Sequence, residues 1–554
     1  SGFIYIVEDS WQIFGTELVT TGQAIQVTPI EKLTFTQNFK YSEEYKFWIK
    51  ISQAVDFSFA MFGISGDGRF TAVYSNYNFS PDFDKRTFTK EVLTFADEAN
   101  KKDSLYWKEI RPVPLTSEEL KDYVRKDSIQ TLRSSKTYLD SIDRVQNKFS
   151  VTDLLFGVDY SNSYKKKHFS ISSPLFGTHF NTVQGYNSTS TISFRKNLDD
   201  NFSRYWRLYS TMNYGFSEER FRIKGGFQMK FNNIKKPQLT IEAGSETAQI
   251  NPTIPISPRV NDITSLFFER NYMKLYERQF AEVSYQQELV NGITLLSDIS
   301  YQQRNALFNT SDNSWVNKND VSYTSNDPLQ PNNFESTPFI DHHIFKMNLT
   351  GKLNFGQKYL SYPDAKVNIT SNKFPTLWLT YETGFGSDVS AYNFNQLRAA
   401  LVQTIKLGNK GNFSYTLKGG TFLEDKEISF LDYQHFNGNQ TRIGTGYYLN
   451  SFNLLPYYDL STKNNYLEFH AEQDFQGWIL GKLPLINKLN YNLILGAHAL
   501  TIENNKPYTE LSVGIDNLGF GKYRLLRLDY VVSNYQGNQE GAFIFGLKFL
   551  GILE

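Results

Sequence analysis

The chain has 554 residues with 57 basic and 57 acidic side chains and no cysteine, which excludes disulfide scaffolds, zinc sites of the CxxC type and cysteine nucleophiles. Aromatic residues make up 16% of the chain although the mean hydropathy is −0.45, a combination expected of a barrel with an apolar outer face and a polar interior. The balanced charge argues against a nucleic-acid partner, and the lack of any run of 18 apolar residues excludes a helical membrane protein.

Residues 1–80 are predicted to form a β-rich segment, which we expect to lie in the periplasm. Its expected strands are 3–18, 32–39, 46–62 and 69–78. Asp67-Gly68 has the composition of a tight turn between the last two of them. The chain begins at Ser1 with neither an initiator Met nor a signal peptide, so we expect it to be a mature or truncated piece of a longer precursor.

Residues 81–150 are predicted to be an extended and helical linker. Thr116 and Glu119 have the spacing of a capping box, in which each side chain satisfies a free backbone amide at the start of a helix. We therefore expect a helix from this point to about Lys136 or Asn147.

Residues 151–554 are predicted to form a transmembrane antiparallel β-barrel, because hydrophobic and polar residues alternate in many separate runs. In Phe221–Phe231, Phe, Ile and Met residues on one face alternate with Arg, Lys and Gln residues on the other. The same alternation recurs in 345–355, 412–418, 467–474, 510–516, 526–532 and 543–549. Several runs have the ~9–11 residues that a tilted strand needs to cross the hydrocarbon layer, and counting them gives about 16 strands, an even number as in bacterial barrels. The predicted fold class is thus an all-β membrane protein; a large soluble all-β protein is the alternative, since its strands also alternate.

Two long polar connections interrupt these strands, at about 309–341 and 425–464. Long loops of such barrels normally face the outside of the cell and short turns face the periplasm. The predicted location is therefore the cell outer membrane, with the lipid bilayer as the expected partner and lipopolysaccharide as a further one. The second connection carries many aromatic residues between Tyr433 and Tyr458 and could occlude the lumen.

One strand carries a stripe of ionisable side chains on the face that we expect to line the lumen. The stripe consists of Glu468, His470, Glu472 and Asp474. Arg527, Lys346 and Lys418 are expected to balance it from other parts of the wall. A hydrated wall of balanced charge and a functional site around His470 both fit this pattern.

Several separated stretches of the chain carry distinctive sequence. They are Ser104–Ile129, Asn181–Asn187, Tyr433–Thr441, Phe452–Thr462, Leu480–Leu489, Tyr508–Gly521 and Phe545–Phe549. Together they resemble a Bacteroidota outer-membrane family of unknown function, which normally joins a carboxypeptidase-regulatory-like domain to a C-terminal barrel related to the BamA/TamA insertase–translocase superfamily. That superfamily has an Arg-Gly-aromatic tip on a loop folded into the lumen. The nearest counterpart here is a candidate lumen loop with Arg442, Gly444 and Tyr447, at a different spacing.

The resemblance implies a non-enzymatic component of outer-membrane protein or lipoprotein assembly or export, working with other envelope proteins. A seam that opens sideways would need a weak closing strand, and Gly541, Gly546 and Gly551 lighten the last one. A channel or porin for small solutes is the first alternative, and a lipid or peptide hydrolase that uses His470 is the second. No HExxH, P-loop or GxSxG motif occurs, so we expect neither a cofactor nor a metal site.

Overall fold

The computed structural model divides the chain into two compact units, Ser1–Thr89 with Asp97–Ile129, and Lys90–Ala96 with Gln130–Glu554. The structure describes residues 1–22, 24–25, 27, 29–61, 64–84, 87–96, 98, 101–110, 115, 117–316, 321–369, 371–423, 427–444, 448–520 and 523–547. In these ranges no helix combines the length and the apolar character that a membrane span requires.

The first unit contains a five-stranded antiparallel meander, in which each strand pairs with the next along the chain. Its strands are β1 (Gly2–Ile6), β2 (Ile13–Thr21), β3 (Ile30–Ser42), β4 (Phe47–Met61) and β5 (Ile64–Val73). Cross-strand register places Leu18, Phe35, Val55 and Phe70 in one apolar row across four strands. The period of two in the sequence therefore follows the two faces of this sheet.

The predicted turn at Asp67-Gly68 is wrong, because both residues lie inside β5. Gly68 pairs with Phe57 of β4, and a Cβ built on this glycine would overlap the Phe57 ring. The glycine makes room for a cross-strand aromatic ring and does not reverse the chain.

Between the meander and the barrel, the described residues form one short strand and four α-helices. They are β6 (Glu91–Thr94), α1 (Ser104–Ile110), α2 (Ser117–Ser134), α3 (Lys136–Gln146) and α4 (Asp153–Phe156). Ser135 separates α2 from α3 and caps α3, because its hydroxyl accepts a hydrogen bond from the Tyr138 amide. Thr116 of the predicted capping box lies outside the described residues. Asp143 of α3 accepts hydrogen bonds from the backbone and the hydroxyl of Ser163, which attaches this helix to the barrel.

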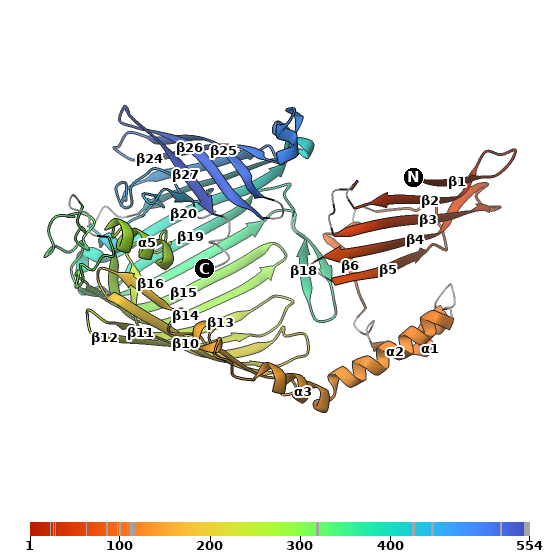
Figure 1. Cartoon of the computed structure of the whole chain (residues 1–554), viewed down its shortest axis with the longest axis horizontal. Helices are drawn as coiled ribbons and strands as arrows, with labels where there is room; N and C mark the ends of the chain where they lie inside the picture. The colour runs from red at the N-terminus through yellow and green to blue at the C-terminus, as the bar shows by residue number, and fades with distance from the viewer. Residues whose placement is uncertain are drawn as a thin grey trace. The chain divides into compact units, whose positions relative to one another are not determined.

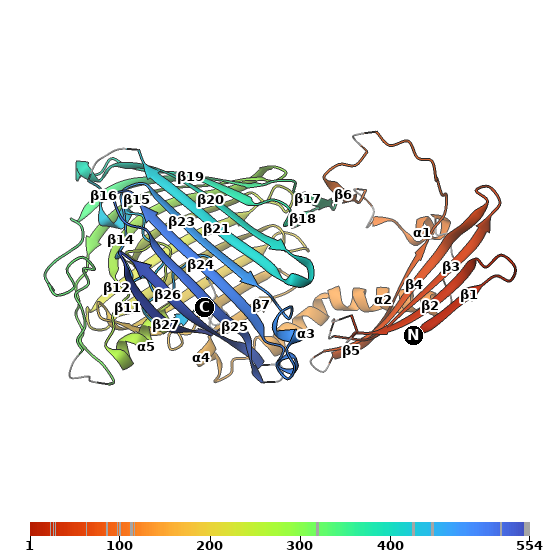
Figure 2. The same ribbon diagram turned by 90° about the horizontal axis from the view of Figure 1, so that it is seen from above.

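The second unit is a closed antiparallel β-barrel (Figures 1 and 2). Its strands are β7 (Val158–Asn162), β8 (Lys167–Ile171), β9 (Thr178–Asn181), β10 (Gly185–Asn197), β11 (Tyr205–Gly215), β12 (Arg220–Lys230), β13 (Gln238–Gln249), β14 (Leu275–Val290), β15 (Ile293–Ala306), β16 (His342–Asn354), β19 (Thr376–Phe385), β20 (Phe394–Lys406), β21 (Asn412–Phe422), β22 (Ile443–Gly444), β23 (Tyr466–Asp474), β24 (Asn492–Ile502), β25 (Tyr508–Phe520), β26 (Tyr523–Tyr535) and β27 (Asn538–Leu547). Within the described ranges there are sixteen barrel strands when β8 and β9 count as one interrupted strand and the short β7 and β22 are set aside. The predicted all-β transmembrane barrel of about 16 strands is confirmed.

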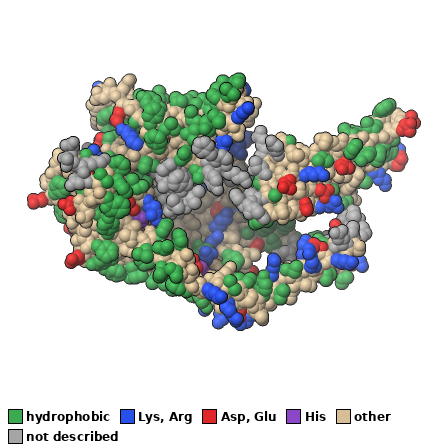
Figure 3. Space-filling model, viewed as in Figure 1, with side chains coloured by type: hydrophobic (Ala, Val, Ile, Leu, Met, Phe, Trp, Pro, Cys, Tyr) green, Lys and Arg blue, Asp and Glu red, His purple; other side chains and the backbone are tan. Residues whose placement is uncertain are grey.

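The outer face of the barrel carries apolar side chains at matching depths on neighbouring strands. One row runs through Leu208, Phe227, Ile241, Val283, Ile299 and Met347, each paired in register with the next. Figure 3 shows hydrophobic side chains spread over the outside of the barrel, and Lys, Arg, Asp and Glu side chains within its hollow. Contiguous apolar surface of this kind is stable against lipid and unfavourable in water.

The two ends of the barrel differ in their connections. The loop end holds α5 (Pro258–Phe268), the connection 307–341, and the connection 423–465 with η4 (Phe430–Asp432). The opposite end, called the turn end, holds the tight turn at Asn291-Gly292. It also holds the hairpin of β17 (Lys358–Ser361) and β18 (Lys366–Ile369), to which β6 adds as a parallel strand. In the described residues four short helices remain: η2 (Ser390–Tyr392) at the loop end, and η3 (Gly408–Lys410), η5 (Leu480–Lys482) and η6 (Ile486–Leu489) at the turn end.

The last strand, β27, is held differently on its two edges. One edge pairs with β26 from Asn538 to Leu547. The other edge carries a parallel bridge with β22, in which Ile443 lies opposite Phe545 and Gly444 opposite Gly546. The sheet order also places β7 beside this edge and hydrogen-bonds the two strands to each other, which closes the barrel. This boundary between β7 and β27 is called the seam.

Candidate functional site: the lumen loop and the seam

The connection 423–465 is called the lumen loop, because its side chains pack against the inner wall of the barrel. Phe452 is fully buried and packs in one cluster with Tyr466, Leu500 and Tyr508 of the wall. At the loop end, four further residues of the lumen loop join a second core with α5 and the connection 307–341. These four are Phe430, Leu431, Tyr457 and Tyr458. The aromatic residues that the sequence places in this loop therefore fill space inside the barrel.

The first anchor of the lumen loop is Asp432 in η4. Its carboxylate accepts hydrogen bonds from Arg304 of β15 at 2.6 and 3.2 Å and from Lys346 of β16 at 2.9 Å. Burial would raise the pKa of Asp432, but the charges of Arg304 and Lys346 outweigh it and hold the pKa well below the ordinary value. Lys346 also pairs with Glu382 at 2.6 Å. Lys346 therefore balances other carboxylates, and the expectation that it balances the stripe around His470 is wrong.

His435 fixes the shape of the loop next to this anchor. Its Nε2 atom lies 2.9 Å from the Phe430 carbonyl oxygen and its Nδ1 atom lies 2.8 Å from the Ser461 hydroxyl. Burial lowers the pKa of His435 to about 4, so the ring is neutral at pH 7, donates from Nε2 and accepts at Nδ1. The two arms of the lumen loop are thereby joined to each other.

The second anchor is Glu510 of β25, which is almost completely buried. Its carboxylate accepts hydrogen bonds from the backbone amides of Asn453 and Leu454, both at 2.8 Å, and from the Tyr508 hydroxyl at 2.6 Å. The Asn453 side-chain amide also donates to it at 3.2 Å. A buried carboxylate that accepts four hydrogen bonds is well satisfied, so the returning arm of the loop is firmly attached to the wall.

The third anchor is the tip of the loop, at the seam. Arg442 pairs with Glu540 of β27 at 2.7 Å, and the Phe545 amide donates to the Arg442 carbonyl oxygen at 3.0 Å. Tyr448 lies under Arg527 of β26, with the guanidinium carbon 3.7 Å from the ring centre. Of the candidate lumen-loop residues, Arg442 and Gly444 thus lie at the edge of β27, whereas Tyr447 lies outside the described residues.

The charge stripe lies on the inner face of β23. Glu468 and His470 are buried, and Glu472 and Asp474 are half-buried. Glu468 pairs with Lys418 at 3.1 Å, and Arg527 joins Glu472 and Asp529, each at 2.8 Å. Arg527 and Lys418 therefore balance the stripe.

His470 belongs to a chain of hydrogen bonds that also reaches the lumen loop. Its Nδ1 atom lies 2.7 Å from Nδ1 of His498 on β24, and its Nε2 atom lies 2.6 Å from Glu468. Nε2 of His498 lies 3.3 Å from the Asn453 side-chain amide. With both rings neutral, each donor meets an acceptor in the direction Asn453, His498, His470, Glu468. His470 is thus a link between loop and wall, and no hydroxyl of the described residues is hydrogen-bonded to either ring.

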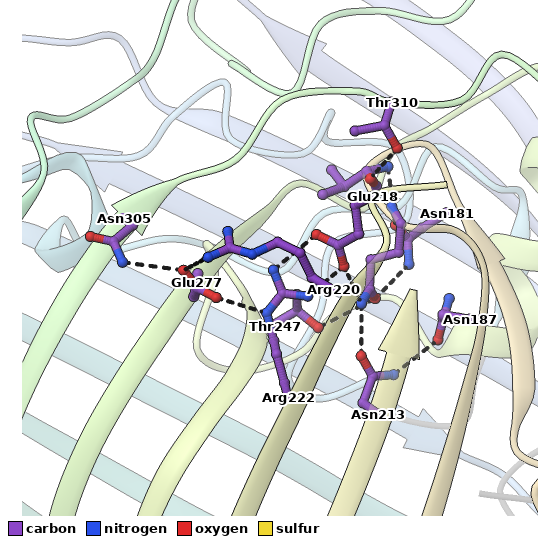
Figure 4. A network of polar contacts seen from close by, with 12 residues as sticks. Asn181, Asn187, Asn213, Glu218, Arg220, Arg222, Thr247, Glu277, Asn305 and Thr310 are labelled. Atoms are coloured by element: carbon purple, nitrogen blue, oxygen red, sulfur yellow. Dashed lines mark hydrogen bonds and ion pairs between the residues drawn. The ribbon is translucent and has the colours of Figure 1, made fainter. Parts of the chain in front are cut away.

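A second polar network crosses the inner wall near the loop end (Figure 4). Arg222 of β12 donates to Glu277 of β14 and to Glu218, both at 2.9 Å, and its side chain is 1% exposed. Gln184 extends this network by donating to Asn213 at 2.7 Å and to Glu218 at 2.9 Å. Together with the aromatic core, the network closes much of the loop end with rigid structure.

A cavity of about 580 Å³ remains between the segment before α5 and the lumen loop, lined in part by Asn437, Asn439, Tyr448 and Lys418. Within the described ranges, no group of three or more His, Asp or Glu side chains is placed to hold a metal ion.

The comparisons with known proteins identify the family. Residues 152–515 match the C-terminal domain of a family of unknown function (DUF5686), and residues 1–77 match the family of unknown function (DUF5686) itself. The chain belongs to DUF5686. No curated protein matches it.

Three solved structures that are similar to this DUF5686 chain are distant from it in sequence. BamA from Haemophilus ducreyi lacking POTRA domains 1–3 is 11% identical, with a TM-score of 0.35 over 93% of this chain and 88% of that one. CdiB from Acinetobacter baumannii is 11% identical, with a TM-score of 0.31 over 66% of this chain, which spans 58% of the CdiB chain. A mutant porin of Rh. blastica is 11% identical, with a TM-score of 0.26 over 65% of this chain and 89% of that one.

Three residues of the site in this DUF5686 chain could not be predicted from its sequence. The sequence predicts no role for His498, Glu510 or Asp432, because each acts through a residue on another strand or loop. The alternation in β24 and β25 does place His498 and Glu510 on the inner face. Only the register between strands could have paired His498 with His470.

Proposed function

We propose that this protein is a non-enzymatic outer-membrane barrel that takes part in the assembly or export of outer-membrane proteins or lipoproteins. The observation that carries the proposal is the parallel bridge at the seam, in which two residues of the lumen loop pair with the edge of β27 that faces β7. Strand edges with free backbone groups bind further strands. A cargo segment could therefore pair with this edge once the lumen loop withdraws and β7 separates from β27.

The three anchors of the lumen loop support this proposal, because they link separate parts of the wall to the seam. Asp432 connects the loop to β15 and β16, Glu510 connects it to β25, and the tip contacts β26 and β27. Movement of the wall at one anchor would therefore shift the lumen loop and change its contacts at the other two anchors. In this proposal phospholipid and lipopolysaccharide surround the barrel, the first unit lies in the periplasm, and other envelope proteins deliver the cargo.

A disulfide across the bridge tests the proposal directly, because the native chain has no cysteine. The double variant Ile443→Cys with Phe545→Cys joins the two residues that face each other in the bridge. In cells depleted of the native protein, we expect the oxidised variant to restore less surface delivery of cargo than the native chain restores. Addition of a reductant should return delivery to the native level.

The matched control is Ile241→Cys with Val283→Cys, an outward-facing pair between β13 and β14 that has no need to separate. We expect this pair to support delivery whether oxidised or reduced. Full delivery by the oxidised seam variant would rule out passage at this edge. Unchanged surface and outer-membrane proteomes after depletion would rule out the whole assembly role.

The two alternatives make different demands. A channel needs a continuous lumen, whereas the lumen loop and the core at the loop end occupy much of this one, so we expect the intact protein to give no steady conductance in planar bilayers. A hydrolase built on His470 needs a hydroxyl beside its ring, whereas Glu468 and His498 occupy both ring nitrogens. We therefore expect no ester or peptide hydrolysis that His470→Ala abolishes.

A further inference from the structure

We propose that the connection between β23 and β24, residues 475–491, is a membrane anchor that inserts into the phospholipid leaflet at the turn end. In this proposal Lys482 and Lys488 hold the phosphate of anionic phospholipid headgroups. The proposal rests on the proposed membrane location of the barrel, and its experiment separates the two. Figure 1 shows this connection as the coiled blue segment beyond the end of β25.

The connection contains an unbroken stretch of exposed residues, several of them apolar. All ten residues from Gly481 to Asn490 are exposed. Four of them are large and aliphatic: Leu483, Leu485, Ile486 and Leu489. Leu485 is 78% exposed, more than any of the outward-facing leucines of the strands. A water-facing turn is normally built from polar residues, so this stretch has the composition of a lipid-facing surface.

The backbone presents Leu485 in a strained conformation. Its φ and ψ angles are +72° and −45°, a combination that residues with a side chain rarely adopt. Two hydrogen bonds hold the turn, from the Asn487 amide to the Leu483 carbonyl at 3.0 Å and from the Lys488 amide to the Leu485 carbonyl at 3.4 Å. Strain at an exposed apolar residue is unexplained by packing within the chain, and insertion into lipid supplies the missing contact.

The charges of the connection are all positive. Residues 475–491 contain Lys482 and Lys488 and no acidic side chain. In the part of the chain that the structure describes, neither lysine forms a salt bridge. Lys482 Nζ lies 4.8 Å from the ring centre of Trp478, and Lys410 Nζ approaches the same ring from the neighbouring turn at 5.8 Å. Lysines beside an aromatic ring are the usual arrangement at the level of lipid headgroups.

The connection continues the apolar belt of the barrel. Leu493, just beyond it, pairs with Ile515, and Ile515 pairs with Leu528. This row lies on the outer face at the turn end, so a lipid leaflet that covers the row also reaches the connection. Continuity with the belt and the positive charge together favour an anionic phospholipid leaflet over a protein partner as the occupant.

Spin labels at single cysteines test insertion, because every cysteine in the chain is then an introduced one. Leu485→Cys is labelled with a nitroxide in the full chain, in nanodiscs of phosphatidylcholine with phosphatidylglycerol, and its collisions with oxygen and with a water-soluble nickel chelate are measured. We expect oxygen to dominate, as it does inside a bilayer. The matched control is Leu329→Cys, a leucine that is 56% exposed on the connection 307–341 at the loop end, where we expect the chelate to dominate.

A label at Leu511→Cys on the outer face of β25 reports on the barrel itself. If Leu511 is in lipid and Leu485 meets the chelate as freely as Leu329, the anchor is refuted and the barrel proposal stands. If Leu511 meets the chelate as well, the membrane location fails first. A Leu485 label that neither reagent reaches would mean that protein covers the connection, and would also overturn the proposal.

The role of the lysines needs a second comparison. We expect removal of phosphatidylglycerol to raise the chelate accessibility of the Leu485 label by at least about twofold in the native background. In the Lys482→Glu and Lys488→Glu double variant, the accessibility should be equally high with and without phosphatidylglycerol. The same response to phosphatidylglycerol in both backgrounds would refute headgroup binding by these lysines.

Discussion

At the scale of single residues, the tip of the lumen loop depends on two glycines. Gly444 and Gly546 face each other in the bridge, and a Cβ built on either one would overlap the Tyr448 hydroxyl. That hydroxyl is buried without a hydrogen-bond partner among the described residues. Tyr448 therefore holds its place through its contact with Arg527 and through the space that the glycines leave. Gly551, the third glycine expected to lighten the closing strand, lies outside the described residues.

Replacement of Gly546 by Ala should loosen the seam. The added methyl group would push Tyr448 away from the bridge, and overpacking of this kind costs about 1–3 kcal/mol. In an Ile443→Cys background, we expect labelling by a membrane-permeant maleimide to become about 5- to 140-fold faster, since about 1.4 kcal/mol corresponds to a factor of ten. The control is Gly541→Ala, which meets the Tyr530 hydroxyl on the exposed outer face, where the ring can move aside. Equal labelling rates in the two variants would contradict this account of Tyr448.

At the scale of elements, sequence predicted the strands well and their partners poorly. The alternation in Phe221–Phe231 is a local signal with a period of two, and it became β12. Bridge partners are set by register and by tertiary contact, which no local pattern contains. β22 is the extreme case, because two residues carry no period and their partner is a strand about a hundred residues further along the chain. Lys346 shows the same difficulty. The sequence shows that it is charged, but only the tertiary structure shows that it pairs with Asp432.

Removal of the tip of the lumen loop should loosen the edge of β27 and leave the barrel wall intact. Asn437 and Phe452 are joined by a 2.8 Å backbone hydrogen bond, so two glycines can replace residues 438–451 between them. The Phe545 amide then loses its acceptor, the Arg442 carbonyl. We expect amide exchange in β27 to accelerate by at least about tenfold, the loss of about one net hydrogen bond. Amides of β14 and β15 serve as the internal reference, and unchanged exchange in β27 would show that another contact holds this edge.

At the scale of the whole molecule, composition predicted the class of protein and left its division open. An alternating strand places equal numbers of residues on the apolar outer face and on the polar inner face of a barrel. A high aromatic content together with a low mean hydropathy therefore favours a barrel. Composition averaged over the whole chain cannot show where one unit ends and the next begins. The structure assigns β6 to the barrel unit, although it precedes α1 and α2. The residues of β6 lie within the predicted linker, and nothing in their sequence indicates that they pair with a hairpin of the barrel.

A chain that begins at Lys90 should therefore fold as a complete barrel. It retains β6 and loses the meander, whose own strands pair only with each other among the described residues. We expect residues 90–554 refolded in detergent to show the same heat-modifiable migration as the full chain. A chain that begins at Gln130 lacks β6, and with it the backbone hydrogen bonds from Tyr359 to Lys90 and from Phe95 to Ser361, both 3.0 Å long. It should still form the barrel, because the wall strands are intact, but amide exchange in β17 should accelerate. If the chain from Lys90 fails to give the folded band while the full chain gives it, the meander is needed for barrel folding and the two units are not independent.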